Sequence, residues 1–472
     1  MTSKWAVLGL AAGLSFCGVQ QIGAQDKPAA APAAEVKAAP APAAPTPPPA
    51  PVDARLKPPI DHLDLKDGDT IVFLGDSITH QCLYTQYVED FFYTRYPTLH
   101  LHFHNAGVGG DRAADALARF DQDVAAYKPK YVTILLGMND GGYKQWDAST
   151  FDVYQVGMLK LLDQIQAIGA TAIVMGPTMF DRDALLLKPN PKRPFDGETS
   201  KYYNAVLAYY GTFMRDQANE RGLNYVDMFA PLNTLSIEGR LKDPNFTMIP
   251  DAVHPDPDGQ TVMAVALLDA VHTPHVVDNT NAFLTPKGWK VTVGPGGKVS
   301  DVEGDAEHLT FTATEPSLPW ILPPDAALGY KLSIAGHHHS TEPFRVAGLA
   351  AGKYELKIDG QSVGVFPSQV LSVKIELQNY PKAPQYQQAL EVATLNKEKN
   401  DKAMHPIRDL YGALKGKRRD PKTTPETLAA YIEQMKPKVA ELEKLQADYE
   451  AKIYEAAQPK TRKYEVVKVV AQ

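Results

Sequence analysis

Short apolar runs alternate with longer amphipathic segments between about residues 56 and 276. The apolar runs are Thr70–Leu74, His100–Phe103, Tyr131–Leu136 and Thr171–Met175, and each ends within two residues of a glycine or an asparagine. Segments 113–126, 151–168 and 201–221 show helical patterns. Apolar strands that alternate with helices are typical of a parallel sheet covered on both faces. The pattern predicts an α/β domain with a doubly wound, flavodoxin-like parallel sheet over residues 58–276.

The pattern changes after residue 276. Short strand-like runs follow without helices between them, at Lys290–Val293, Leu309–Ala313, Tyr330–Ile334, Tyr354–Ile358 and Val363–Phe366. Asp359-Gly360 separates the last two runs and is typical of a tight hairpin turn. We therefore expect a small antiparallel β domain over residues 277–380.

The last segment, 381–472, is predicted to form a helical hairpin and a terminal strand. Its helical stretches are Gln385–Asn400 and Glu426–Ala457, and apolar residues from Leu428 to Ile453 follow a 4-3 spacing. Such a seam most often packs internally, so we expect it to lie against residues 385–395. The basic run Lys415–Arg419 is interpreted as a solvated connector, and residues 464–470 as the strand.

The first residues resemble a targeting signal. Lys4 precedes an apolar run from Trp5 to Val19, which is shorter than the ~20 residues of a bilayer-spanning helix and fits a secretory signal peptide. Residues 1–24 are assigned to that signal, and the Ala- and Pro-rich residues 25–57 to an extended linker. Two alternatives stay open, a lipoprotein modified at Cys17 and a retained membrane anchor. We expect an exported protein, secreted or periplasmic, with no stable membrane span once the signal is removed.

Composition excludes several function classes. The 472 residues carry a net charge of −7, with 55 acidic and 48 basic residues, so no basic excess points to nucleic acid. Of the two cysteines, Cys17 lies in the predicted signal, and Cys82 is interpreted as a core residue. A disulfide-stapled scaffold and a cysteine-ligated zinc site are therefore not expected.

Polar residues with catalytic potential follow the predicted strands. They are Gly75-Asp76-Ser77, the glycine loop 105–111, Gly137-Met138-Asn139-Asp140 and, late in the domain, Asp251-Ala252-Val253-His254. In open α/β sheets, ligands bind at the carboxyl ends of the strands. A hydroxyl, hydrogen-bond donors and an imidazole with a carboxylate are the parts that acyl transfer requires.

These four segments resemble, in order, the sequence blocks of the GDSL or SGNH hydrolase superfamily, over less than half of the chain. The resemblance implies that Ser77 is the nucleophile, His254 the general base and Asp251 the carboxylate that orients it. It also implies an oxyanion hole formed by the backbone N–H groups of Ser77 and Gly110 and the side-chain amide of Asn139. Ser77 stands in Gly75-Asp76-Ser77-Ile78-Thr79, which lacks the second glycine of the Gly-x-Ser-x-Gly pattern of a strained nucleophile elbow.

Each of these residues also has a structural interpretation. Ser77 could cap a helix, and Asn139 and Asp251 could each belong to a turn. The presence of all four blocks favours the catalytic interpretation. We interpret Asp76 and Asp111 as structural hydrogen-bonding residues.

Together with the predicted signal peptide, the resemblance predicts a secreted serine esterase with an acyl-enzyme mechanism and no cofactor or metal. Its substrate is expected to be a small acyl ester, such as acetyl, on a carbohydrate. Alternatives are a lysophospholipase or thioesterase-type lipolytic hydrolase and a catalytically inactive envelope binding protein. Tyr143, Trp146 and Phe180 are candidates for contacting a sugar ring or an acyl chain.

Two histidine clusters are not interpreted as metal sites. His100, His102 and His104 alternate along one strand, which fits the polar side of an edge strand. His337-His338-His339 fall in a predicted loop of the β domain, and adjacent residues of an extended chain point to opposite faces, which makes a poor ligand set.

Overall fold

The structure is a computed structural model that describes residues 62–187 and 201–469. The predicted signal peptide, residues 1–24, and the linker, residues 25–57, lie outside the described residues. None of the helices in the described ranges combines the length and the apolar character that a bilayer-spanning segment requires.

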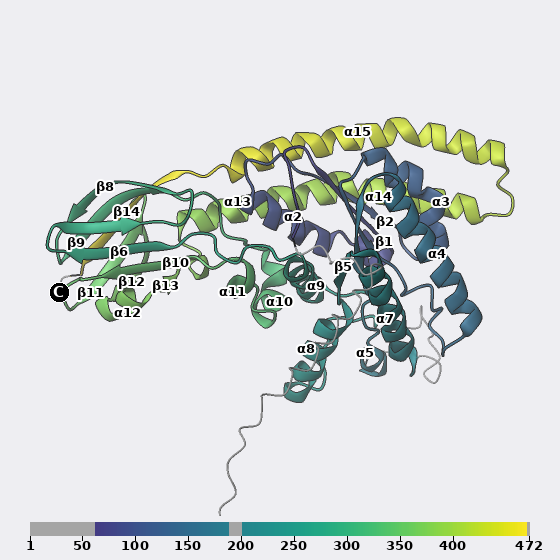
Figure 1. Cartoon of the computed structure of the whole chain (residues 1–472), viewed down its shortest axis with the longest axis horizontal. Coiled ribbons are helices and arrows are strands. Elements are labelled where there is room, and N and C mark those ends of the chain that lie inside the picture. The colour runs from purple at the N-terminus through teal and green to yellow at the C-terminus, as the bar shows by residue number, and fades with distance from the viewer. Residues whose placement is uncertain (1–61, 188–200, 470–472) are drawn as a thin grey trace, which may run out of the picture. The chain divides into compact units, whose positions relative to one another are not determined.

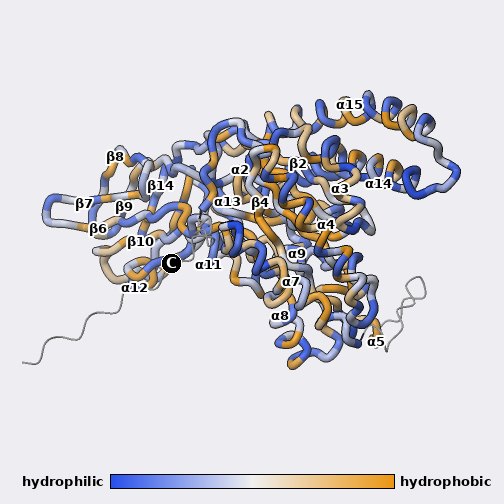
Figure 2. Tube along the Cα trace, turned by 45° about the vertical axis from the view of Figure 1, so that its right-hand side comes forward, coloured by the Kyte–Doolittle hydropathy of each residue, from blue (hydrophilic) through white to orange (hydrophobic). Residues whose placement is uncertain are grey.

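A five-stranded parallel sheet forms the centre of the first part of the chain (Figure 1). Its strands are β1 (Thr70–Gly75), β2 (His102–Gly107), β3 (Tyr131–Leu135), β4 (Thr171–Met175) and β5 (Asn224–Val226). The order is β2-β1-β3-β4-β5, with every neighbouring pair parallel. The predicted doubly wound α/β fold is confirmed. Figure 2 shows much of the interior of this region in orange, because strands such as β1 and β4 consist mainly of buried apolar residues.

The connections place helices on both faces of the sheet. From β1, helix α2 (Leu83–Arg95) leads to the edge strand β2. The chain then runs in the opposite direction through α3 (Ala113–Asp123), α4 (Ala148–Ala167) and α7 (Tyr203–Arg221). Because crossovers between parallel strands are right-handed, opposite directions place α2 on one face and these three helices on the other. Helix α9 (Pro257–Ala270) contacts α2 and therefore covers the same face.

The β region contains two sheets. The four-stranded sheet has the order β13-β10-β6-β7, from Ile375–Glu376, Pro343–Ala347, Thr280–Thr285 and Gly288–Thr292. The five-stranded sheet is antiparallel with the order β12-β11-β14-β9-β8, from Gln361–Pro367, Lys353–Ile358, Thr461–Lys468, His308–Thr314 and Lys298–Gly304. Strand β14, the predicted terminal strand, pairs with β11 and β9. The five-stranded sheet therefore includes β14, which pairs between β11 and β9 although it follows them by about 100 residues or more in sequence.

Three details of this region differ from the sequence prediction. Strands β10 and β6 are parallel rather than antiparallel. The run Tyr330–Ile334 was expected to be a strand, but most of it lies in helix α10 (Ala327–Leu332), which packs on α9. His337–His339 were expected in a loop and lie in the short helix α11 (Ala335–His339). Packing against α9 outweighs the modest β preference of these residues.

The helical region lies against the parallel sheet domain. Helix α13 (Pro384–Lys399) continues through a π-helical turn (Asn400–Met404) into α14 (His405–Arg419), and α15 (Pro425–Ala457) returns alongside. The seam of α15 packs on α13 as expected, and also on α14. Helix α13 contacts α2, and its Ala389 and Val392 belong to the same apolar core as β1. The predicted connector 415–419 is wrong, because these residues form the last turn of α14.

Strand β2 lies at the sheet edge, but its histidines contact protein rather than solvent alone. The His102 Nδ1 atom is 2.9 Å from Glu450 Oε2 of α15, and His104 Nε2 is 2.9 Å from Asp123 Oδ1 of α3. The alternating polar side of β2 therefore faces other polar groups. Within residues 62–187 and 201–469, the other α-helices are α1 (Ser77–His80), α5 (Arg182–Leu187), α8 (Phe229–Lys242) and α12 (Ser368–Val373).

Candidate active site

Ser77 is the first residue of α1, directly after β1. A Cβ atom on Gly75 would lie 2.1 Å from Thr79 Oγ1, and one on Gly107 would lie 2.3 Å from the His80 nitrogen. Only glycine at these two positions lets α1 sit so close to the ends of β1 and β2. The backbone N–H of Ile78 donates to Asp76 Oδ1 at 2.9 Å and caps the helix. These contacts fix Ser77 at the carboxyl end of the sheet.

The structure brings Ser77, His254 and Asp251 into one hydrogen-bonded line. His254 Nε2 is 2.7 Å from Ser77 Oγ, and His254 Nδ1 is 2.7 Å from Asp251 Oδ2. The other carboxylate oxygen of Asp251 accepts from the backbone N–H groups of Val253 and His254, at 3.0 and 2.8 Å. Asp251 therefore holds both the loop before α9 and the imidazole ring on it.

The charge of Asp251 favours one tautomer of the His254 ring. Burial alone raises the pKa of the Asp251 carboxyl, but hydrogen bonds from the His254 ring and backbone outweigh that effect and hold the pKa well below its usual range. The carboxylate thus stays ionised and accepts from Nδ1–H. In the neutral ring, Nε2 then carries the lone pair, which faces the Ser77 hydroxyl and can receive its proton.

The predicted oxyanion donors lie at the neighbouring strand ends. Within the described residues, the backbone N–H groups of Ser77 and Gly110 have no hydrogen-bond acceptor. The Asn139 amide nitrogen donates to Asp76 Oδ2 at 3.0 Å and to the Asp111 carbonyl at 3.1 Å. An oxyanion would therefore find two uncommitted backbone donors and an amide that has to share or exchange an acceptor.

Gly110 is required for its backbone conformation rather than for close approach. Its φ is +68°, in the left-handed region that favours glycine. A Cβ atom there would meet only Lys415 Nζ, at 3.5 Å.

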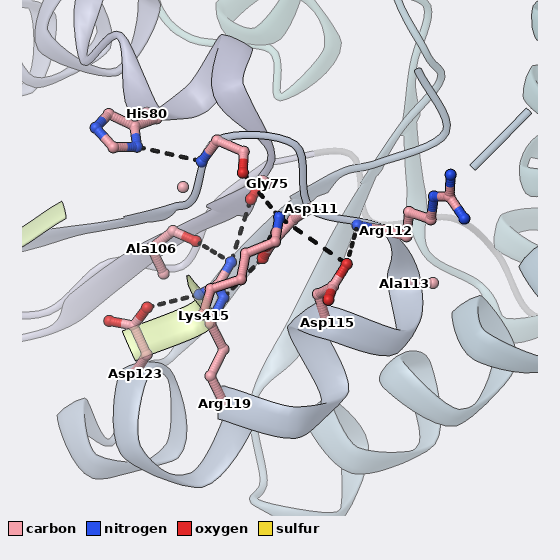
Figure 3. Close-up of polar contacts among 12 residues, drawn as sticks. Gly75, His80, Ala106, Asp111, Arg112, Ala113, Asp115, Arg119, Asp123 and Lys415 are labelled. Carbon is pink, nitrogen blue, oxygen red and sulfur yellow. Dashed lines mark hydrogen bonds and ion pairs between the residues drawn. The ribbon is translucent and has the colours of Figure 1, made fainter. Parts of the chain in front are cut away.

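Asp76 and Asp111 are structural hydrogen-bonding residues, as expected. Asp76 is fully buried, and burial raises the pKa of its carboxyl to about 7, with backbone donation from Ile78 opposing that rise. Asp111 is also buried, and its Oδ2 accepts from Arg119 Nε at 2.8 Å (Figure 3).

The aromatic candidates for substrate contact occupy different places. The Tyr143 hydroxyl donates to Asn139 Oδ1 at 2.9 Å, so this side chain orients a predicted oxyanion donor. Phe180 is buried in the core. Trp146 is 48% exposed and packs edge-on against Tyr209.

Sequence reasoning missed two residues that contact the glycine loop. His80 Nδ1 accepts from the Gly109 N–H at 3.3 Å, and burial, followed by the charge of Arg408, lowers the pKa of His80 to about 4. Lys415 Nζ donates to the Gly109 carbonyl at 2.7 Å and forms an ion pair with Asp111 Oδ1 at 2.8 Å (Figure 3). No local sequence signal links Lys415 to a loop about 300 residues away, because only the tertiary fold places α14 beside it.

Comparisons with known proteins find relatives of this chain. Residues 73–262 match the model of the GDSL-like lipase/acylhydrolase family. An acetylxylan esterase from Geobacillus stearothermophilus is 26% identical over 227 residues, which cover 44% of this chain and 95% of that protein. A solved structure of a gut microbial diltiazem-metabolizing enzyme is similar with a TM-score of 0.76 and 25% identity, and the match covers 87% of this chain and all of that one.

The last similarity extends well beyond the region that the family model matches. The region that the family model matches contains the hydrogen-bonded line from Ser77 to Asp251. It also contains the four sequence blocks and nearly all of the parallel sheet. The chain is therefore a hydrolase that acts on carboxylic esters, and its residues 73–262 are similar to the GDSL-like lipase/acylhydrolase family.

Proposed function

We propose that the protein is an exported serine esterase that removes small acyl groups, acetyl above all, from carbohydrates. The observation that carries the catalytic assignment is the line from Asp251 through His254 to Ser77, with both hydrogen bonds at 2.7 Å. The carbohydrate acetyl substrate is supported by the sequence similarity to an acetylxylan esterase.

The proposed reaction has two steps. Ser77 Oγ attacks the ester carbonyl while His254 Nε2 takes its proton, and the oxyanion is bound by the N–H groups of Ser77 and Gly110 and by the Asn139 amide. His254 then protonates the leaving alcohol. Water, activated by the same ring, releases the acyl group and restores the serine.

The assignment of Ser77 is tested by one variant and one probe. Ser77→Ala should reduce ester hydrolysis by at least roughly a thousandfold while the unfolding temperature stays near that of the wild type. A fluorophosphonate should label the wild type at Ser77 and leave the variant unlabelled. Hydrolysis by Ser77→Ala at a rate near that of the wild type would show that another group is the nucleophile.

Substrate class is tested with a panel of esters. Acetylated xylan, acetylated xylo-oligosaccharides, short aryl acetates, diltiazem, and a lysophospholipid are compared by kcat/KM. The proposal predicts the highest values for acetylated sugars. Faster cleavage of long acyl chains would instead assign a lipolytic hydrolase.

Export rests on the N-terminal sequence pattern. Expressed in a host with a Sec pathway, the full chain should appear in the periplasm or medium with its first 24 residues removed, which mass spectrometry of the intact protein detects. An unprocessed protein in the cytosol would contradict the proposal.

A further inference from the structure

The loop that carries Gly110 is held from outside the family-matched region. Lys415, on α14, contacts the residues on both sides of Gly110, through the Gly109 carbonyl at 2.7 Å and the Asp111 carboxylate at 2.8 Å. The Lys415 side chain is only 12% exposed. Figure 3 shows it reaching into the same polar cluster as Arg119 and Asp123.

Helix α14 is itself fixed in place by buried charges. The fully buried Arg408 donates to both carboxylate oxygens of Asp123, at 2.7 and 2.8 Å. Asp123 also accepts from Arg119, which in turn bonds Asp111. Because this network holds α14 in place, the Lys415 ammonium group has a defined position next to the loop that carries Gly110.

We infer that Lys415 is a positioning residue for the oxyanion hole, an inference that rests on the proposed function. By binding the Gly109 carbonyl and the Asp111 carboxylate, Lys415 fixes the peptide whose N–H is the Gly110 donor. The Asp111 carbonyl also accepts from the Asn139 amide, so the same clamp sets the position of a second donor. The C-terminal helices thereby become part of the catalytic apparatus.

The test compares Lys415→Met with Lys417→Met, a control on an exposed position of the same helix. A misplaced oxyanion donor weakens binding of the transition state more than binding of the substrate. For Lys415→Met we therefore expect kcat on an acetyl ester to fall roughly ten- to a hundredfold, with KM changed by less than about threefold. The rate of fluorophosphonate labelling should fall with kcat. Lys417→Met should match the wild type in all three values.

A second variant and the serine variant make the outcome decisive. Lys415→Gln serves if Lys415→Met does not fold, and the same loss is expected. A kcat within about twofold of wild type in the folded variant, or a loss confined to KM, overturns the inference. Ser77→Ala is assayed beside them. If it keeps its activity, the proposed function has failed, whereas an inactive Ser77→Ala with an unaffected Lys415 variant rejects only the role of Lys415.

A separate group of side chains has the composition of a metal site. Asp269, in the last turn of α9, lies beside His338 and His339 of α11. The Asp269 Oδ1 atom is 3.2 Å from His338 Nδ1 and 3.1 Å from His339 Nε2, and one ligand atom from each residue lies within 4.8 Å of the others. The helical form of residues 335–339, not expected from the sequence, is what brings two adjacent histidines to one carboxylate.

His339 provides the most specific observation. Its side chain is fully buried, and its Nδ1 lies 3.2 Å from the Thr273 hydroxyl, which itself donates to the Leu268 carbonyl. In the neutral tautomer in which Nδ1 donates to Thr273, Nε2 carries a lone pair on the side of Asp269. Nε2 lies 3.1 Å from Asp269 Oδ1, the same oxygen that contacts His338 Nδ1. A lone pair beside a carboxylate oxygen is a place for a cation.

The geometry points to a zinc ion held by Asp269, His338 and His339. Zinc binds imidazole nitrogen and carboxylate oxygen at ~2.0–2.2 Å, and tetrahedral ligands are then about 3.3 Å apart, close to the two contacts here. Asp269 and His338 are partly exposed, which provides entry and a fourth position for water. Such an ion would join α9 to α11, away from Ser77, and stabilise the fold rather than act on the ester.

The zinc site is tested on tag-free protein treated with EDTA and then titrated with zinc. Wild type should bind a stoichiometric amount of zinc by calorimetry and elemental analysis, with a higher unfolding temperature than the EDTA-treated protein. His338→Ala should lose at least about tenfold in zinc affinity, while His337→Ala, an exposed neighbour outside the cluster, should bind as wild type. Wild type without stoichiometric zinc, or equal binding by the two variants, overturns the site.

Discussion

At the scale of single residues, Asp251 has two roles that can be separated: it orients the His254 ring, and it holds the loop before α9 by accepting backbone hydrogen bonds. Asp251→Asn keeps a side chain of the same shape, but it removes the charge that favours the productive tautomer of His254. We expect kcat at neutral pH to fall by about two to four orders of magnitude with the fold intact. The assay is ester hydrolysis together with thermal unfolding. Asp256→Asn is the matched control, because Asp256 only caps α9 and asparagine caps equally well.

Tyr143 illustrates orientation of a donor by a neighbour. Its hydroxyl donates to Asn139 Oδ1 and so fixes which end of the amide faces the site. Tyr143→Phe should lower kcat roughly tenfold and leave KM of a short acetyl ester nearly unchanged. Tyr209→Phe, the same substitution on a 49% exposed tyrosine, serves as the control. A Tyr143→Phe variant that loses only KM would mean that the ring contacts substrate instead.

Much of the candidate site could be predicted from the sequence, because its residues follow predicted strands. The carboxyl ends of parallel strands converge, so Ser77, Gly110 and Asn139 had to approach one another. His254 and Asp251 share one short loop. The contacts of Lys415, Tyr143 and His80 could not be predicted, because they depend on side-chain directions and on a helix far along the chain.

At the scale of elements, the docking of α13 on α2 depends on a buried ion pair. Lys399 Nζ lies 3.0 Å from Glu89 Oε2, and both side chains are almost fully buried. Lys399→Met leaves Glu89 without its charge partner, so we expect a loss of roughly 3–5 kcal/mol in the free energy of unfolding. Denaturant titration measures it. Adding Glu89→Gln should recover part of the loss.

Lys402→Met is the control for this prediction. Lys402 pairs with Glu398 on the exposed side of the same helical segment, so its removal should cost less than about 1 kcal/mol. Equal losses for Lys399→Met and Lys402→Met would show that the buried pair does not fix α13.

The elements themselves were predictable to different degrees. The runs at 70–74, 131–136 and 171–175 became β1, β3 and β4 almost unchanged, because fully buried strands are uniformly apolar. Helix α14 was missed although Ile407, Tyr411 and Leu414 have helical spacing and are buried. Three apolar positions among many charged residues are a weak signal, and only packing on β2 and α15 decides it.

At the scale of the whole molecule, acid stability should depend on buried histidine. His104 faces Asp123, Arg408, Arg119 and Tyr127, and burial, opposed by its hydrogen bond to Asp123, lowers the pKa of its ring to about 4. An unfolded histidine titrates near pH 6.5. Between pH 6.5 and 4, His104 therefore binds a proton in the unfolded state but stays neutral in the folded state. This group removes stability as pH falls through that window, by roughly 1 kcal/mol per pH unit.

The test is the pH slope of the free energy of unfolding rather than its absolute value. His104→Gln should lose less stability than wild type between pH 6.5 and 4.5, and His308→Gln, on an exposed position, should follow wild type. Identical slopes for His104→Gln and wild type would show that the ring is protonated inside the fold. Carboxyls with raised pKa, such as Asp76, act in the opposite direction, which is why the difference between variants is the quantity to measure.

The distribution of core residues also predicts that the proposed active site and the C-terminal helices unfold together. Ile453 of α15 is fully buried in the apolar core that contains β1 and the helices around Ser77. Ile453→Ala should cost about 2–5 kcal/mol, and it should lower the midpoints of thermal inactivation and of far-ultraviolet circular dichroism by the same amount. Ile237→Ala, on the 52% exposed Ile237, should move neither midpoint appreciably. If Ile453→Ala unfolded at a lower temperature by circular dichroism but lost ester hydrolysis only at the wild-type temperature, the two parts would unfold independently. The C-terminal helices would then not be needed to hold the loop that carries Gly110.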